Sequence, residues 1–482
     1  MTSVMLSISQ EAYRRKRFHY FLLFQLSICL NWRSWATATL GGIPSFYDVG
    51  GNRQLFAWHF DPEEAAYSND GVASSVILWL SGGPGCSSLL ALFGENGPYT
   101  IEPRSLRTPE AVPNPYSWIK SGATVIWLDQ PVGTGFSYGG VPRHDTEEGV
   151  AEDVWSFLVS WFKRFPEYEG RSLEIFGESY AGHYVPAVGR KILHKNQDNA
   201  NYYLNLTGIA IGNGFTDPAV QYKYYAPFAK EHDLVPPAEL KMMDQTLKLC
   251  EPLVDGCNSK DDDIIAWTEC FNAYLVCNMG LIYPVELSGV NPYDIRDQCE
   301  VQPLCYDFSP IDDFLARPEV RDELGIPEDH TWSECNTVVD LAMVYGGDWT
   351  KNFRKDVEEI LDDKSSGNPI EVLIYAGEYD FVCNWMGNLA WTENLSWEGS
   401  EGYAAAKEQS WVTATQKVAG TFKSYSNLTF LKVFDAGHLV PFDQPENSLD
   451  MVKQHLNRSF SQTNESQMDI FLKDVPKFKK KE

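Results

Sequence analysis

Short apolar runs recur along the chain and predict strands that are buried on both faces. Each run ends in a loop rich in glycine or acidic residues, and segments of helical periodicity, such as Glu148–Phe165 and Val185–His194, lie between the runs. The runs are Ser75–Leu80, Thr124–Leu128, Leu173–Phe176, Leu206–Ile211, Val372–Tyr375 and Leu428–Phe434. This alternation predicts an α/β fold, with a mostly parallel central sheet flanked by helices. Parallel sheets carry their chemistry at the carboxyl ends of the strands, so we expect the functional residues in the loops after these runs.

The pattern changes between about residues 216 and 345. This stretch is rich in cysteine, tyrosine and acidic residues, and it has helical periodicity without strong strand runs. It separates two blocks of sheet-like sequence, so we interpret it as a helical insertion over the sheet. The expected parts are a leader (1–40), a first core part (41–215), an inserted helical cap (216–345), a second core part (346–467) and a basic tail (468–482).

Charge and the first residues indicate a secreted, acidic protein. The 482 residues hold 39 Lys and Arg against 66 Asp and Glu, a net charge of −27, which argues against nucleic-acid binding. Residues 1–40 contribute +4, so the remainder carries −31. A basic cluster, the apolar run Phe21–Leu30 and the small residues Ala36–Ala38 predict a signal peptide, with a signal anchor or a misassigned gene start as alternatives. We expect no stable membrane span after the leader is removed.

Cysteines and glycosylation sequons point to the same compartment. The chain has 10 cysteines, too few for a disulfide scaffold, so disulfides would supplement a core. Four of them, Cys250, Cys257, Cys270 and Cys277, lack the two-residue spacing and the histidines of zinc sites, so we expect no metal. The N-x-S/T sequons predict glycans at Asn205, Asn394, Asn427, Asn457 and Asn464.

Two segments contain a candidate nucleophilic serine. A nucleophile elbow needs a strand, a tight turn and then a helix, so that the serine hydroxyl projects above the sheet. Ser179, in G-E-S-Y-A-G, follows a predicted strand and precedes a helix-like stretch. Ser137, in the literal G-F-S-Y-G, leads into G-G-V-P, which cannot start a helix. We therefore expect Ser179 to be the nucleophile and Ser137 to be a loop residue.

A serine nucleophile needs a base and a group that orients the base. In folds that carry such a nucleophile elbow, the acidic residue follows the serine in the sequence and the histidine comes last. Asp380 follows the run V-L-I-Y, and His438 follows L-T-F-L-K-V-F, so both are expected at strand ends. His183 is one helical turn past Ser179 and is expected to pack in the helix, and His455 is expected on a helix surface.

Several motifs together resemble the serine carboxypeptidases, most closely fungal and yeast vacuolar or secreted members. They are W-L-S-G-G-P-G-C-S-S at 79–88, D-Q-P-V-G-T-G-F-S-Y at 129–138, G-E-S-Y-A-G at 177–182, I-G-N-G-F-T-D-P at 211–218, D-F-V-C-N-W at 380–385 and G-H-L-V-P-F-D-Q-P at 437–445. The resemblance runs in order from about Ser45 to Phe460. It implies an α/β-hydrolase fold, no cofactor, and release of C-terminal residues from peptides and proteins through an acyl-enzyme.

The resemblance also implies roles for individual residues. Ser179 would be the nucleophile, His438 the general base and Asp380 its orienter. The backbone N–H groups of Gly83 and Tyr180 would form the oxyanion hole, because a glycine loop lets its backbone approach the substrate and Tyr180 directly follows the nucleophile.

Binding of the substrate's terminal carboxylate would fall to Trp79, Ser81, Glu95 and Glu178. Neighbouring carboxyl groups cannot all be ionised, so they share a proton and at least one pKa rises. Binding of the terminal carboxylate would then weaken as pH rises, so activity would be favoured under acidic conditions. Ser81 departs from the family, which usually has Asn there, and acyltransferase relatives also replace that Asn.

Cysteine roles follow from the resemblance as well. Cys383 would be a thiol in the pocket for the penultimate side chain, with a buried structural cysteine as the alternative. Without it and the leader's Cys29, eight cysteines remain, and sequence alone allows about 105 pairings. The resemblance implies Cys86–Cys335, Cys250–Cys277, Cys257–Cys270 and Cys299–Cys305.

Three functions remain in competition. The leading one is a serine carboxypeptidase of the secretory pathway, secreted or delivered to a vacuole or lysosome. The second is an acyltransferase or esterase on the same fold, suggested by Ser81. The third is a catalytically silent relative that acts by binding, which the complete set of Ser179, Asp380 and His438 disfavours. Side-chain preference and oligomeric state cannot be predicted from these motifs.

Overall fold

The computed structural model describes residues 40–62, 74–102, 109–140, 146–198, 202–259, 264–302 and 304–460. The described residues from Gly42 onward belong to one compact unit. The predicted leader, the basic tail and the sequon at Asn464 therefore lie outside the described residues, apart from the last residue of the leader.

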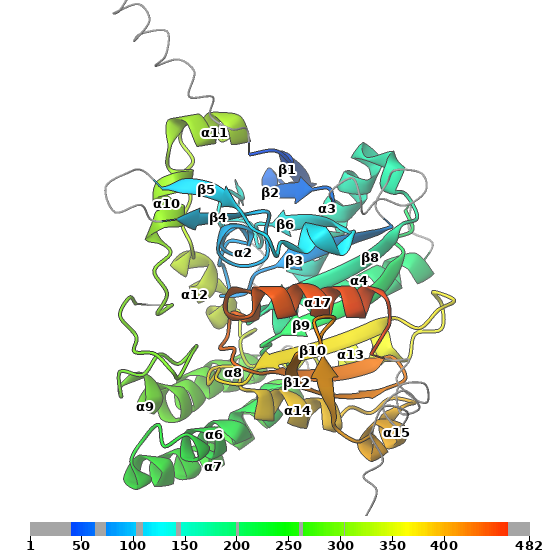
Figure 1. Cartoon of the computed structure of the whole chain (residues 1–482). Coiled ribbons are helices and arrows are strands. Elements are labelled where there is room, and N and C mark those ends of the chain that lie inside the picture. Colours follow the sequence, from blue (N-terminus) through cyan, green and yellow to red (C-terminus); the bar gives the residue numbers. More distant parts are fainter. Residues whose placement is uncertain are drawn as a thin grey trace, which may run out of the picture. The chain divides into compact units, whose positions relative to one another are not determined.

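A mostly parallel sheet of 11 strands forms the centre of the described residues (Figure 1). Its order is β1-β2-β6-β3-β8-β9-β10-β13-β12-β11, with β7 paired to β2, and the six strands from β6 to β13 are parallel to one another. The strands are β1 (Ile43–Gly50), β2 (Arg53–Phe60), β3 (Ser75–Leu80), β6 (Thr124–Leu128), β7 (Tyr138–Gly139), β8 (Ser172–Glu178), β9 (Leu206–Gly212), β10 (Glu371–Gly377), β11 (Gln409–Val412), β12 (Val418–Tyr425) and β13 (Leu428–Val433). The α/β fold prediction is confirmed. A separate pair is formed by β4 (Tyr99–Glu102) and β5 (Glu110–Pro113).

Helices cover both faces of the sheet because its central strands are apolar on both sides. On one face, α4 packs on β3 and β8, and α3 packs on β1 and α4, within a large apolar core that includes Leu78 and Ile175. On the other face, α17 lies across the strands (Figure 1), where His455 contacts the ring of Phe176. The helices are α2 (Leu89–Gly94), α3 (Glu147–Arg164), α4 (Ala181–Gln197), α5 (Pro218–Gln221), α6 (Tyr225–Glu231), α7 (Pro237–Ser259), α8 (Ile264–Cys277), α9 (Tyr283–Glu286), α10 (Ser309–Leu315), α11 (Pro318–Leu324), α12 (Thr337–Tyr345), α13 (Arg354–Leu361), α14 (Trp385–Glu393), α15 (Ser400–Ala405), α16 (Val440–Asp443) and α17 (Pro445–Leu456), with short 3₁₀ or π turns η2 (Trp118–Ser121), η3 (Pro166–Tyr168), η4 (Tyr222–Tyr224) and η5 (Asn278–Ile282).

The long segment between β9 and β10 is helical, from α5 to α13. The described residues contain four disulfides, and they are the pairs that the resemblance implies: Cys86–Cys335, Cys250–Cys277, Cys257–Cys270 and Cys299–Cys305. Two of them join α7 to α8, and Cys86–Cys335 ties the glycine loop after β3 to the residues before α12. In the part of the chain that the structure describes, Cys383 is a free, buried cysteine.

Two residues, Asn427 and His455, are more buried than their local sequence suggests, so the expectation of His455 on a helix surface is wrong. Asn427 is 4% exposed, and its Nδ2 donates to the backbone oxygens of Leu361 and Ile370, so the atom that would carry a glycan is buried. His455 is 5% exposed, with Nε2 3.1 Å from Glu174 Oε2. Of the other sequons, Asn394 and Asn457 are exposed and Asn205 is half-buried. Within the described ranges, no helix combines the length and apolar character needed to cross a bilayer.

Candidate active site

Ser179 occupies a tight turn between β8 and α4. Its φ of 65° is a left-handed conformation that is strained for a residue with a side chain. The turn is closed by backbone hydrogen bonds to the Ser179 carbonyl from Gly182 N at 2.9 Å and Phe215 N at 3.0 Å. A Cβ at Gly177 would lie 2.6 Å from the Ala181 Cβ, so glycine at 177 leaves room for alanine at 181. The imperfect elbow motif therefore still builds a strand–turn–helix junction that presents the serine.

Ser137 has a structural role. It is 3% exposed, its Oγ donates to the Asp129 carbonyl at 2.6 Å, and it accepts the backbone N–H of Phe56 at 2.7 Å. The first hydrogen bond closes the loop after β6, the second joins this loop to β2, and together they leave the hydroxyl without access to a substrate. Asp129 also accepts hydrogen bonds from Ser87 Oγ and Ser88 N, so this buried network holds the glycine loop after β3.

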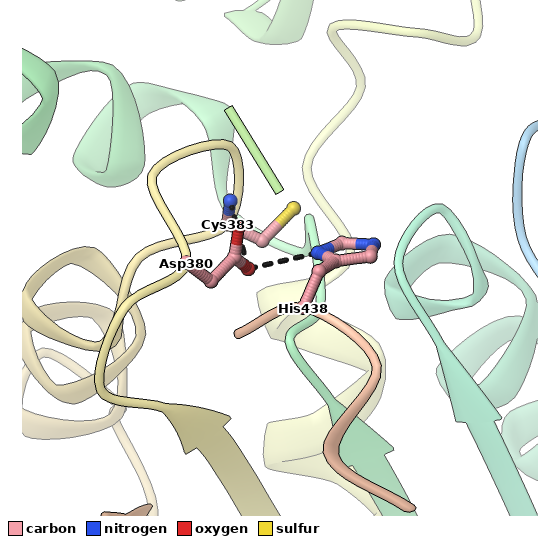
Figure 2. Close-up of side chains that lie close together, drawn as sticks. All are labelled: Asp380, Cys383 and His438. Carbon is pink, nitrogen blue, oxygen red and sulfur yellow. Dashed lines mark hydrogen bonds and ion pairs between the residues drawn. The ribbon is translucent and has the colours of Figure 1, made fainter. Parts of the chain in front are cut away.

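Asp380 and His438 form a buried pair at neighbouring strand ends. Asp380 follows β10 and His438 follows β13, and these two strands are paired in the sheet. Asp380 Oδ2 lies 2.8 Å from His438 Nδ1 (Figure 2), and the residues are 0% and 3% exposed. A carboxylate only accepts, so the ring donates from Nδ1 and its Nε2 stays available to take a proton. This is the arrangement of a base held by its orienter.

Asn213 is a site residue that the sequence reasoning missed. Its Nδ2 donates to Asp380 Oδ2 at 2.8 Å, and its own backbone is held by the carbonyl of Tyr375 at 2.7 Å. The backbone N–H of Cys383 also donates to Asp380 Oδ2, at 3.2 Å. Its position in the sequence could have indicated a site residue, because Asn213 follows β9, the strand between those that end at Ser179 and Asp380.

Ser179 and His438 line one cavity, which brings the expected nucleophile and the expected base together. Glu95, Glu178 and Ser81 line the same cavity. No hydrogen bond joins Ser179 to the His438 ring among the described residues, as is common before substrate binds. The remaining lining residues are Gly82, Gly83, Cys86, Leu90, Tyr293, Leu304, Tyr306, Phe308 and Leu439. Tyr293, Leu304, Tyr306 and Phe308 come from the helical segment, and no motif had marked them.

The glycine loop after β3 lies against the turn that carries Ser179. A Cβ at Gly82 would be 2.4 Å from the Tyr180 backbone N, so only glycine permits this approach. Gly83, Ser179 and Tyr180 line a second cavity together with Cys383. The Tyr180 hydroxyl donates to Asp348 Oδ2 at 3.0 Å, which fixes the side chain behind that N–H. Two backbone N–H groups beside a nucleophile can stabilise a developing oxyanion.

Glu95 and Glu178 are a buried carboxyl pair, 6% and 4% exposed. Burial raises the pKa of Glu95 to about 8, and the Asp443 carboxylate adds to the rise. Burial, the charges of Glu95 and Asp380, and a hydrogen bond with Glu95 raise the pKa of Glu178 well above its usual value. The pair therefore holds a shared proton at acidic and neutral pH. Apart from the contact between the two carboxyls, the buried Oε2 of each has no hydrogen-bond partner among the described residues, so the pair has hydrogen-bonding capacity left for a ligand.

Trp79 and Ser81 contact each other rather than acting as two separate groups in the cavity. Trp79 is 0% exposed, and its indole Nε1 donates to Ser81 Oγ at 3.1 Å. Ser81 lines the cavity, and Trp79 does not. Because Ser81 Oγ already accepts the indole hydrogen, its own hydroxyl hydrogen is free to donate to an anion in the cavity.

Cys383 lies next to the Asp380–His438 pair (Figure 2). A carboxylate oxygen, Sγ and a ring nitrogen of these three residues lie within 4.8 Å of one another, as a metal site would require. Burial raises the pKa of the Cys383 thiol well above its usual value, and the Asp380 and Glu178 charges add to this, so the metal-binding thiolate is disfavoured. Asp380 Oδ2 already accepts three hydrogen bonds. The geometry fits support of a histidine base better than metal ligation.

Comparisons with known proteins agree with this site. The family model described as serine carboxypeptidase matches residues 44–458. Carboxypeptidase Y from Saccharomyces cerevisiae is 41% identical over 419 residues, 85% of this chain and 74% of that protein. Carboxypeptidase Y from Candida albicans is 42% identical over 417 residues, 86% of this chain and 72% of that protein. The crystal structure of KEX1(delta)p, a prohormone-processing carboxypeptidase from Saccharomyces cerevisiae, superposes with a TM-score of 0.72 at 27% identity, covering 86% of this chain and 91% of that one.

Proposed function

Because the chain belongs to the serine carboxypeptidase family, we propose that it releases C-terminal residues from peptides and proteins through an acyl-enzyme on Ser179. The chain is thus a serine-type hydrolase that acts on peptide substrates. The observation that carries the exopeptidase mechanism is the Glu95–Glu178 pair, which lies in the same cavity as Ser179 and His438. A group that holds a carboxylate beside the nucleophile selects the last peptide bond.

The reaction follows from these positions. His438 Nε2 takes the proton of the Ser179 hydroxyl as its oxygen attacks the carbonyl carbon of the last peptide bond, and Asp380 stabilises the resulting imidazolium. The backbone N–H groups of Gly83 and Tyr180 bind the oxyanion. His438 then protonates the leaving amine, and the C-terminal residue departs. Water attacks the acyl-enzyme by the reverse sequence of proton transfers and regenerates Ser179.

Recognition of the terminal carboxylate sets the direction of the pH dependence. The protonated Glu95–Glu178 pair and the Ser81 hydroxyl donate hydrogen bonds to the carboxylate. As pH rises toward the Glu95 pKa of about 8, the pair loses its proton and repels the substrate's charge. The Michaelis constant for peptides is therefore lowest at acidic pH, and the enzyme favours acidic conditions.

The test uses one peptide with a free and with an amidated C-terminus, between pH 4 and 8. Mass spectrometry should show trimming of the free form only, its Michaelis constant rising with pH, and no trimming by Ser179→Ala. Equal trimming of both forms would exclude recognition of the terminal carboxylate by the Glu95–Glu178 pair. Ester turnover with transfer to an added alcohol, in place of peptide trimming, would favour the acyltransferase alternative suggested by Ser81.

The compartment and the domain division are part of the same proposal. Four disulfides and the exposed sequons at Asn394 and Asn457 support passage through the secretory pathway, ending in secretion or in a vacuole or lysosome.

The helical segment 216–345 acts as a cap inserted between the core parts 41–215 and 346–467. This is supported by Tyr293 and Tyr306, cap residues that line the catalytic cavity.

A further inference from the structure

One short segment, residues 291–297, is hydrogen-bonded to both loops of the Asp380–His438 pair. On the Asp380 side, the backbone N–H groups of Phe381 and Val382 donate to the Pro292 carbonyl, each at 3.1 Å. On the other side, the His438 backbone N–H donates to the Tyr293 carbonyl at 2.7 Å. The backbone of the 291–297 segment therefore lies between the two catalytic loops and is attached to each.

Arg296, in this segment, contacts the same two loops with its side chain. Its guanidinium lies over the ring of Tyr379, 5.0 Å from the ring centre. Tyr379 directly precedes Asp380 in the sequence. Its Nη1 donates to the Asp435 carbonyl at 3.0 Å, and its Nη2 lies 3.1 Å from Asp443 Oδ2. Asp443 Oδ2 in turn accepts the backbone N–H of Gly437 at 2.6 Å, one residue before His438.

Asp294 fixes the orientation of this guanidinium. Arg296 Nε donates to Asp294 Oδ1 at 2.8 Å, and Arg296 Nη2 donates to Asp294 Oδ2. The Asp294 side chain is 4% exposed and the Arg296 side chain 36%, so the carboxylate is shielded from water while the guanidinium is partly exposed. The planar fork of an arginine is needed to bind Asp294, Asp443 and a carbonyl while stacking on Tyr379, because a lysine presents one point charge.

We propose that Arg296 is a positioning residue for the catalytic pair, holding the Asp380 and His438 loops at the spacing that keeps their hydrogen bond at 2.8 Å. This inference rests on the proposed peptidase function. The two loops leave different strands and touch each other directly through Tyr379 N and the Ala436 carbonyl at 2.8 Å. Arg296 adds a side-chain link between them. A misplacement of about 1 Å in a catalytic group can cost about 100-fold in rate.

The test is Arg296→Lys, which keeps the charge and removes the fork. We expect kcat for a peptide to fall about 10- to 100-fold with the Michaelis constant nearly unchanged, because the substrate-binding groups are untouched. The matched control is Arg317→Lys. Arg317 donates with Nε and Nη2 to one oxygen of Glu319 and with Nη1 to the Pro109 carbonyl, and none of these residues lines the catalytic cavity. The control should keep the wild-type kcat.

A spectroscopic signature separates positioning from a loss of folding. The low-field proton signal of the His438 Nδ1–H should shift or broaden in Arg296→Lys and stay unchanged in Arg317→Lys. If Arg296→Lys fails to fold, Asp294→Asn serves instead, since it keeps Arg296 and weakens only its anchor, and a smaller fall in kcat is expected. A folded variant with wild-type kcat and an unmoved proton signal would overturn the inference. Failure of the proposed function is distinguishable, because the wild type itself would then not trim peptides.

Discussion

The Glu95–Glu178 pair should make the stability of the protein fall as pH rises, and Glu178→Gln should weaken that dependence. A glutamine amide donates to the Glu95 carboxylate at every pH, so the hydrogen bond between the two side chains no longer needs a proton. The side chain keeps nearly the same shape and stays buried. The substitution therefore changes the protonation requirement with little change in packing.

The magnitude follows from the pKa of Glu95, which is 4.5 for an ordinary glutamate and about 8 here. Between these values the folded protein holds a proton that the unfolded chain has released. The stabilisation is thus fully present below about pH 4.5 and is lost as pH rises toward 8. At about 1.4 kcal/mol per pKa unit, the Glu95 shift alone corresponds to about 5 kcal/mol of pH-dependent stability, and the raised pKa of Glu178 adds to it.

The assay is urea unfolding at pH 4.5, 6 and 8, comparing the wild type with Glu178→Gln. The wild type should lose more unfolding free energy across this range than the variant, because Glu178, whose pKa is raised by burial, no longer titrates in the variant. A surface control is Glu398→Gln, which removes an exposed carboxylate paired with Lys364. Parallel curves for the wild type and Glu178→Gln would refute the shared-proton argument.

Three further predictions concern residues around the site. Ser137→Ala should lower the unfolding free energy by about 1–3 kcal/mol, measured in urea, with kcat unchanged, because its hydroxyl only bridges two backbone groups; a large loss of kcat in folded protein would contradict this. Asn213→Ala removes a hydrogen bond to the buried Asp380 carboxylate, and steady-state kinetics should show kcat lower by about 10- to 100-fold, whereas wild-type kcat would exclude a supporting role. Peptide mapping by mass spectrometry should find Asn427 unmodified and a glycan on Asn394, and a glycan on Asn427 would contradict the burial of its Nδ2.

The central strands could be predicted because burial on both faces leaves a continuous apolar run. Two of them, Ser75–Leu80 and Thr124–Leu128, have the predicted ends in the structure. The outer antiparallel strands β1, β2, β11 and β12 were not predicted. Their mixed polar and apolar residues resemble ordinary loops until the chain places them against a neighbouring strand.

Asn427 and His455 show the limit of local pattern. An N-x-T sequon and a histidine on an amphipathic helix both suggest solvent exposure. Asn427 instead satisfies two carbonyls that lie 57 and 66 residues away in sequence, and His455 meets Glu174 across 281 residues. Such partners depend on the packing of distant segments, so nothing near either residue could indicate them.

By itself the sequence determined the α/β fold, the elbow serine and the order of serine, acid and histidine, because each depends on a strand and the few residues that follow it. Only the tertiary structure decided which groups complete the site. Asn213 reaches Asp380 from a third strand end, Tyr293 faces His438 from the helical segment, and Arg296 bridges two catalytic loops. These residues come together because paired strands align their carboxyl ends and the inserted segment folds back between the loops, which is a relation in space that no stretch of sequence contains.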